Sequence, residues 1–148
     1  MFSKLKGAGR RILVIDDDLA IRVLLEAVLE RMSFDVELAA DGAAGLERIQ
    51  SGAHFDLILL DLMMPRLNGY EFISAIDRLH GFRRHHIVVF TASGQQGIDA
   101  IPASSVCNAI LKPFDLDRFI EIITECLDDS HIEGPFTASS SPTPTPPA

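Results

Sequence analysis

The sequence predicts an α/β fold, a doubly wound parallel sheet, on two observations. Apolar runs of four or five residues alternate along the chain with longer segments in which apolar residues recur at helical spacing. One of these runs, Leu57 to Leu60, has no polar alternation, which is typical of a strand buried on both faces. Strands that alternate with helices favour a parallel sheet with helices on both of its faces.

Five strands are expected, and each is followed by a segment with helical character. The strands lie at residues 11–15, 35–39, 57–60, 87–90 and 108–111. The first helix is expected from Leu19 to Met32, with Asp18 as its cap. Its apolar residues at helical spacing are Ile21, Leu24, Leu25, Val28 and Met32.

The later helices carry their own start and stop signals. Asp41 caps a short helix, and Asn68 with Glu71 three residues later predicts an N-cap pair for the next. Pro102 allows only a short or broken helix before the fifth strand, and Asp115 caps the last helix. Inward residues are expected to be Phe72, Ile73, Ile76 and Leu79 in the third helix, and Leu116, Phe119, Ile120, Ile123 and Leu127 in the last.

The length and the charge limit the class of protein. A chain of 148 residues, 47% of them hydrophobic, suffices for one domain with a core but hardly for two. We expect a flexible basic head at residues 1–9, the domain at 10–129 and a disordered Ser/Thr/Pro-rich tail at 130–148, either inert or a partner-binding peptide. The net charge of −8 makes nucleic acid an improbable ligand.

The two cysteines and the hydropathy indicate the compartment. Cys107 and Cys126 match no metal spacing and suggest no disulfide framework. No stretch approaches the ~18 apolar residues of a membrane span. We therefore expect a soluble protein of the reducing cytoplasm, without membrane contact.

Polar side chains gather where the predicted strands end. In open parallel sheets, ligands bind beyond the carboxyl ends of the strands. In this chain, polar residues follow the carboxyl ends of the predicted strands, and the amino ends carry no comparable set. The residues at the carboxyl ends are Asp16, Asp17 and Asp18 after the first strand, Asp61 after the third, Thr91 after the fourth and Lys112 after the fifth.

This set of residues predicts phosphoryl chemistry. Crowded carboxylates repel one another, and Mg²⁺, which favours a few carboxylates together with a phosphate oxygen, would balance them. An ionised aspartate is a competent nucleophile for phosphoryl transfer, which depends mainly on positioning and charge neutralisation. We therefore predict a metal between Asp17 and Asp61, with Lys112 and Thr91 contacting the phosphoryl oxygens and Asp61 as the acceptor.

Four motifs in order carry a family resemblance. ILVIDDD, LILLDLMMPRLNGYEF, VVFTAS and AILKPF resemble the receiver domain of two-component response regulators over residues 10–128. The resemblance implies a flavodoxin-like (βα)5 fold with strand order 2-1-3-4-5. It also implies a single-domain regulator that receives phosphate on Asp61 from a histidine kinase or a phosphotransfer protein, and then switches a downstream protein or relays the phosphate.

The resemblance also assigns roles to single residues. Mg²⁺ would be held directly by Asp17, Asp61 and the backbone carbonyl of Met63, and indirectly by Asp16. Thr91 would be the switch hydroxyl. Lys112 would contact the phosphoryl group, with a cis peptide before Pro113.

Two departures from the family pattern concern output and lifetime. Receivers usually place Tyr or Phe three residues before the lysine, where this chain has Ala109, so the readout is expected to be altered while the chemistry stays intact. Met63 and Ser93 occupy the positions that tune hydrolysis of the phosphoryl group. Because neither is a carboxylate or an amide, we expect a slow loss of phosphate.

Rival interpretations remain open at this point. One alternative is that the fold serves as a binding module that is never phosphorylated. A phosphohydrolase of the haloacid-dehalogenase type needs a second acid two residues after the nucleophile, where Met63 stands, and a nucleotide hydrolase lacks its GxxxxGK motif. The strand-end residues also have ordinary structural interpretations, as a helix-start cluster (Asp16 and Asp17), a β-former (Thr91) and a surface lysine (Lys112).

Two further surfaces have open interpretations. The stretch HGFRRHH at 80–86 is either a solvated loop or a metal or anion site. Ile122 and Cys126 beside the buried stripe of the last helix indicate either a dimer or partner face, or partial burial.

Overall fold

Five parallel strands form one sheet in the order β2-β1-β3-β4-β5 in the computed structural model, which describes residues 9–79, 87–92, 94–102 and 105–129. This order confirms the predicted doubly wound fold. The strands are β1 (Arg11–Ile15), β2 (Asp35–Ala39), β3 (Leu57–Asp61), β4 (Ile87–Thr91) and β5 (Asn108–Leu111).

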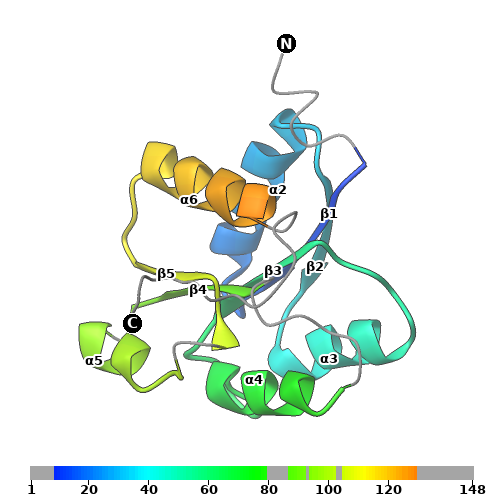
Figure 1. Cartoon of the computed structure of the whole chain (residues 1–148), viewed down its shortest axis with the longest axis vertical. Coiled ribbons are helices and arrows are strands. Elements are labelled where there is room, and N and C mark those ends of the chain that lie inside the picture. Colours follow the sequence, from blue (N-terminus) through cyan, green and yellow to red (C-terminus); the bar gives the residue numbers. More distant parts are fainter. Residues whose placement is uncertain (1–8, 80–86, 93, 103–104, 130–148) are drawn as a thin grey trace, which may run out of the picture.

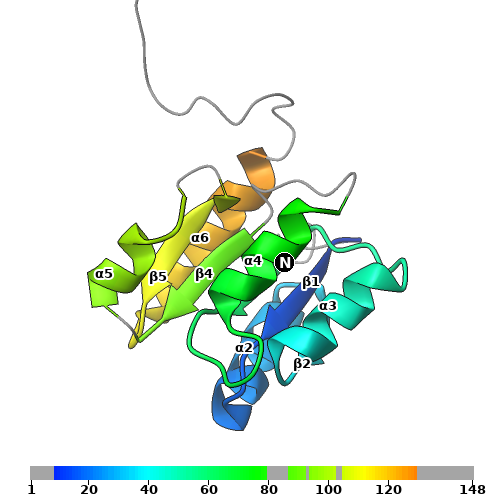
Figure 2. The same cartoon turned by 90° about the horizontal axis from the view of Figure 1, so that it is seen from below.

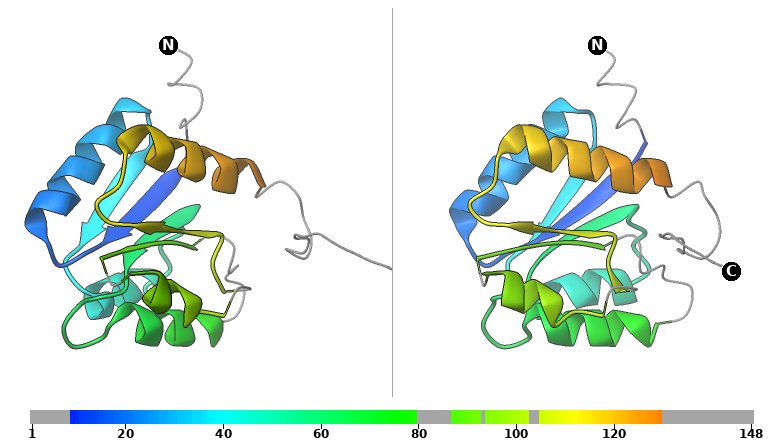
Figure 3. Two further views of the ribbon diagram at one scale, coloured as in Figure 1. Left: turned by 90° about the vertical axis from the view of Figure 1, so that its left-hand side faces the viewer. Right: turned by 60° about the vertical axis from the view of Figure 1, so that its left-hand side comes forward.

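Helices cover both faces of the sheet. α2 and α6 lie on one face, and α3, α4 and α5 lie on the other (Figures 1 and 3). The bounds are α2 (Leu19–Arg31), α3 (Gly42–Gln50), α4 (Gly69–Asp77), α5 (Gly94–Asp99) and α6 (Leu116–Asp129). Seen from below, the strands run side by side between these two layers of helices (Figure 2).

The predicted caps begin three of the helices. The Asp18 carboxylate accepts hydrogen bonds from the first turn of α2, and that of Asp41 accepts one from the Ala44 N–H of α3. Asn68 and Glu71 form a complete capping box at α4. α5 ends three residues before Pro102, as expected. The side-chain cap by Asp115 stays a prediction.

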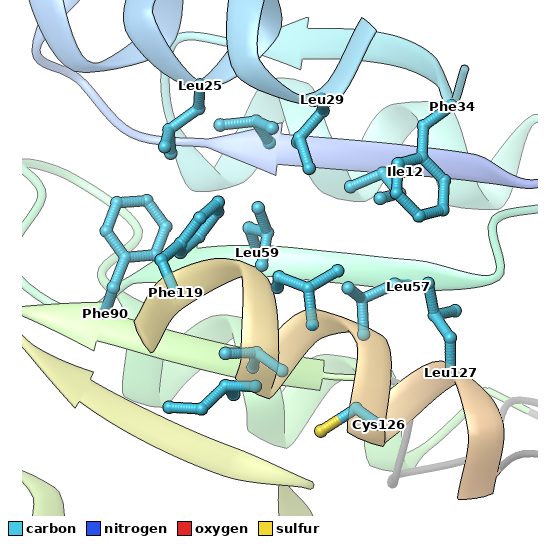
Figure 4. Packing of buried hydrophobic residues seen from close by; sticks show 14 of the residues in the cluster. Ile12, Leu25, Leu29, Phe34, Leu57, Leu59, Phe90, Phe119, Cys126 and Leu127 are labelled. Atoms are coloured by element: carbon cyan, nitrogen blue, oxygen red, sulfur yellow. The ribbon is translucent and has the colours of Figure 1, made fainter. Parts of the chain in front are cut away.

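The side chains of each strand pack in two separate cores, because successive side chains point to opposite faces of the sheet. Leu57 and Leu59 pack under α2 and α6, whereas Ile58 and Leu60 pack under α3 and α4. Figure 4 shows the first core, where Leu25 and Leu29 of α2 meet the side chains of β1, β3 and α6.

The prediction for one α2 residue is wrong. Leu24 was expected inside, but it is 41% exposed, because the fully buried stripe of α2 runs through Leu25 and Leu29. Leu19 and Val23 are also exposed, at 64% and 53%. α2 therefore presents an apolar strip to solvent, beginning next to the predicted site.

The prediction for the cysteines is also wrong. Cys107, just before β5, is bonded to Cys126 of α6, with the Cα atoms 6.1 Å apart. The two cysteines are 19 positions apart, and no spacing pattern records their contact, because α6 runs back across the sheet beside β5. Ile122 and Cys126 are both buried, which excludes the dimer or partner face proposed for them.

Several expectations lie outside the described part of the chain. The structure does not describe residues 1–8 of the head, the 80–86 segment, Ser93 and the 130–148 tail. The expectations for them stay predictions. Among the described residues, no helix has the length and apolarity needed to cross a bilayer.

Candidate functional site

The parallel register brings the predicted polar residues to one edge of the sheet. Ile15 of β1 pairs with Leu60 of β3, so the residues that follow, Asp16 and Asp61, end neighbouring strands. Asp61 in turn pairs with Phe90, the residue before Thr91. The central position of β1, between β2 and β3, places its acidic end beside the predicted acceptor.

Asp16 is fully buried, yet hydrogen bonds and an ion pair hold its carboxylate. One oxygen accepts from the backbone N–H of Asp18 at 2.8 Å, and the other lies 2.8 Å from the Lys112 ammonium. The Asp16 carbonyl accepts from the Arg22 guanidinium at 2.7 Å, which ties α2 to the site. These contacts offset the cost of burying a charge.

Lys112 lies between two carboxylates. Its Nζ atom is 3.6 Å from Asp61 Oδ2, farther than from Asp16, and it stands 5.0 Å from the centre of the Phe90 ring. The Lys112–Pro113 peptide is cis, as the resemblance implied. The backbone N–H of Lys112 donates to the Thr91 carbonyl at 2.8 Å, so the lysine is fixed to the end of β4.

Asp61 is buried with little positive charge around it. Burial, and then the negative charge of Asp16, raise the pKa of the Asp61 carboxyl to about 6. The Met63 N–H, which donates to Asp61 Oδ1 at 3.2 Å, and the Lys112 charge lower that pKa but do not offset the increase. The site therefore favours a further cation next to the ionised carboxylate.

Three carboxylates are close enough to share one metal ion. Oxygen atoms of Asp16, Asp17 and Asp61 lie within 4.8 Å of one another, and Asp17 is exposed to solvent. Hard oxygen ligands of this kind, with room for water, are those that Mg²⁺ prefers. The donor set and the raised pKa of Asp61 both fit such an ion.

Thr91 and Met63 differ in their exposure. Thr91 is fully buried at the end of β4, and its predicted contact with a phosphoryl group stays a prediction. Met63 is 56% exposed next to Asp61. The role of the Met63 carbonyl in metal binding stays a prediction. So does the role of Met63 and Ser93 in hydrolysis of the phosphoryl group.

The loop after Asp61 is held against the end of β3. A Cβ atom at Gly69 would lie 2.6 Å from the Leu62 Cα and 2.9 Å from the Asp61 carbonyl oxygen, so only glycine fits there. Arg66, at a φ of 63°, donates to the Asp41 carboxylate at 2.7 Å. Sequence reasoning missed this ion pair, because no spacing pattern connects residues 25 positions apart.

A shallow apolar hollow of about 340 Å³ adjoins the site. Lys112 lines it together with Ile21 and Leu24 of α2, with Phe114 just before α6 and with Leu116 at the start of α6. It continues the exposed strip of α2, so the charged site has an apolar rim on this side.

Comparison with known proteins agrees with this geometry. Residues 12–124 match the family model of the response regulator receiver domain. The chain belongs to this family. It is 33% identical to the chemotaxis protein CheY of Bacillus subtilis over 123 residues, covering 81% of this chain and 99% of CheY.

Other members of the family are longer. The response regulator ArlR of Staphylococcus saprophyticus is 32% identical over 122 residues, 79% of this chain but 52% of ArlR. The regulator RpaA of Synechocystis, described as DNA-binding, is 35% identical over 115 residues, 74% of this chain and 46% of RpaA. The chain thus spans about half the length of several relatives that it matches.

Solved structures share the fold. A CheY-like receiver domain protein of Methanospirillum hungatei is 30% identical, with a TM-score of 0.72 over 84% of this chain and 98% of that one. The response regulator TrrA of Thermotoga maritima is 27% identical, with a TM-score of 0.69 over 79% of this chain and 98% of that one. The protein is therefore a receiver domain of the two-component type, and the family to which it belongs consists of signalling proteins.

Proposed function

We propose that this receiver accepts a phosphoryl group on Asp61 in a Mg²⁺-dependent reaction and signals through protein contacts or a phosphorelay. The observation that carries the proposal is the position of Asp61, buried 3.6 Å from the Lys112 ammonium and within a shared carboxylate cluster. A histidine kinase or a histidine phosphotransfer protein would supply the phosphate.

The transfer needs little beyond what this site holds. A carboxylate oxygen of Asp61 forms a bond to phosphorus while the P–N bond to the donor histidine breaks. The electron pair of that bond stays on the imidazole nitrogen, and the proton on the other ring nitrogen of the phosphohistidine makes the departing imidazole neutral. Lys112 and Thr91 then contact the oxygens of the transferred group, whose added negative charge attracts the lysine from Asp16 towards Asp61.

The ion would neutralise charge on the incoming phosphoryl group. Asp17, Asp61 and the Met63 carbonyl would hold it directly, and Asp16 indirectly. The TrrA structure, which shares this fold and was solved in complex with Mg²⁺ and a beryllium fluoride, supports the binding of Mg²⁺ by this receiver. Hydrolysis of the resulting acyl phosphate would be slow, because neither Met63 nor Ser93 offers a carboxylate or an amide to attacking water.

The apolar rim supports a protein as the phosphate donor. Leu19, Val23 and Leu24 are exposed next to the site, and apolar surface of this kind marks protein contacts. A small phosphorylated metabolite would gain nothing from it. We also propose a cytoplasmic location, no contact with nucleic acid, and action in the manner of CheY, whose length the match almost completely covers.

Phosphorylation can be tested directly. The protein is incubated with a small acyl-phosphate donor and Mg²⁺, and intact mass is measured. We expect the mass of one phosphoryl group to be added, and the product to be removed by hydroxylamine, as an acyl phosphate is. Asp61→Asn and omission of Mg²⁺ should each abolish the gain.

Asp99→Asn is the matched control, because Asp99 is an exposed aspartate that accepts one hydrogen bond within α5. That variant should be phosphorylated like the parent. If the parent gains nothing, even with a phosphorylated histidine protein as the donor, the proposal fails and the chain is a binding module that acts without phosphate.

A further inference from the structure

The disulfide joins the last strand of the sheet to the helix that covers it. Cys107 directly precedes β5, and Cys126 lies in the second half of α6. Cys126 is buried in the core shared by α2 and α6 (Figure 4), whereas Cys107 is half-buried at its margin. The covalent ring from Cys107 to Cys126 contains all of β5, the turn with Lys112 and most of α6.

The same ring contains two of the three walls of a second hollow. This hollow, of about 450 Å³, lies among α5, β5 and α6. Gln95 and Ile98 of α5 form one wall, while Ala109, Arg118 and every other lining residue fall between Cys107 and Cys126. The bond therefore fixes the β5 wall to the α6 wall and leaves the α5 wall unattached.

Ala109 leaves this hollow unfilled. Its methyl group stands in the middle of β5, an edge strand that pairs only with β4 among the described strands. An alanine offers no rotamers, so a change of side-chain conformation at this position cannot alter the surface. A change in how firmly β5 is joined to α6 can alter that surface.

We propose that Cys107 and Cys126 form a redox-sensitive pair whose disulfide holds β5 against α6, and whose reduction loosens that face independently of phosphorylation at Asp61. The proposal goes beyond phosphate transfer, since neither sulfur belongs to the carboxylate site. It gives the face around Ala109 a means of control that does not require an aromatic side chain.

The reaction is a thiol–disulfide exchange with a dithiol reductant. A reductant thiolate attacks the Cys107 sulfur, which is the more exposed of the two, and the Cys126 sulfur leaves as a thiolate and takes up a proton. The second reductant thiol then displaces Cys107, so that the reductant is oxidised to its disulfide by two electrons. A disulfide oxidant such as oxidised glutathione runs the same reaction backwards.

The first test asks whether both forms exist in the folded protein. The full chain is equilibrated in glutathione buffers of graded potential, its free thiols are alkylated, and intact mass is measured. We expect the two thiols to appear and disappear together, in one two-electron transition. Two free thiols under every oxidising buffer, or a bond that forms only between chains, would overturn the proposal.

The second test asks whether the bond controls the face. Hydrogen exchange is compared between the oxidised and the reduced protein, in the Asp61→Asn background so that phosphate plays no part. Reduction should speed exchange in β5 and α6 by about tenfold or more, and leave α3 unchanged. Equal exchange in both forms would contradict the inference.

The matched control is Cys107→Ala with Cys126→Ala, which should exchange like the reduced protein under all buffers. Alanine is chosen because Cys126 is buried among apolar side chains. If the double variant does not fold, Cys107→Ser alone serves, since this residue is half-buried and its loss also removes the bond. A response to redox buffer that persists in the variant would overturn the proposal.

Discussion

Two neighbouring regions that share β5 are built differently. One is the carboxyl edge of the sheet, and the other is the β5–α6 face, which comprises the hollow around Ala109 and the Cys107–Cys126 bond. At the edge, Asp16, Asp61 and Thr91 are all buried, and each position is fixed by backbone contacts. At the face, Ala109 leaves a hollow and one covalent bond joins the walls. The proposed phosphoryl chemistry needs fixed charges and would constrain the edge, whereas the hollow at the face leaves room for its lining side chains to change.

The largest effect that would sharpen this contrast is expected at Lys112. Lys112→Met should slow phosphorylation of Asp61 by about 10²-fold, because a preorganised cation next to the developing charge is lost. The rate is measured by intact mass with an acyl-phosphate donor. Lys112→Arg keeps the charge and should lose less, while a rate within threefold of the parent for the methionine variant would contradict the assigned role.

The packing of the edge can be broken at Gly69. Gly69→Ala should lower the free energy of unfolding by about 1–3 kcal/mol, since the new Cβ meets backbone atoms of Leu62 and Asp61 that cannot easily move. Urea unfolding measures the change. Gly45→Ala is the comparison, because the atoms nearest to its Cβ would all be side-chain atoms, of Ile15 and Phe72, and not backbone atoms. An equal or larger loss at Gly45 would be inconsistent with this explanation.

A smaller effect is expected at the cap next to the loop of the site. Asp41→Ala should lower the free energy of unfolding by about 1 kcal/mol, while Asp41→Asn retains an acceptor and should lose less. The Ala44 N–H, followed by the Arg66 side chain, lowers the pKa of the Asp41 carboxyl from 3.8. Its charge therefore stabilises the fold above that value, and this contribution is lost as the pH falls through the lowered pKa.

Urea unfolding of the parent and of Asp41→Asn at neutral and at acid pH checks this sign. The difference between the two proteins should be greatest near neutrality and should shrink below pH 3.8. A difference that grows in acid would show that the Arg66 contact does not act through the carboxylate charge.

The smallest effect is expected at Ala109. Ala109→Tyr should change the free energy of unfolding by less than about 1 kcal/mol, because the hollow beside it can accept a ring without overpacking. The same change at Ala39, buried in β2, should cost about 1–3 kcal/mol or more. Parallel urea titrations compare the two, and equal losses would indicate that the hollow does not accommodate the ring.

Local signals predicted most of the edge and little of the face. The strand runs, the caps and the residues at the strand ends follow from local sequence, because parallel strands deliver their carboxyl ends to one edge. Which strands are neighbours came only from the family resemblance. The disulfide, the Arg66–Asp41 pair and the exposure of Leu24 depend on how distant elements are rotated against each other, and no local pattern records that rotation.

The position of Lys112 makes its ammonium group a reporter of the state of the site. It lies nearer to Asp16 than to Asp61, and it stands over the Phe90 ring. A proton, a metal ion or a phosphoryl group arriving at Asp61 changes the balance of charge between its two carboxylate neighbours. Any displacement that follows also changes its place in the magnetic field of the ring, so the resonance of a labelled Lys112 would register each event without an added probe.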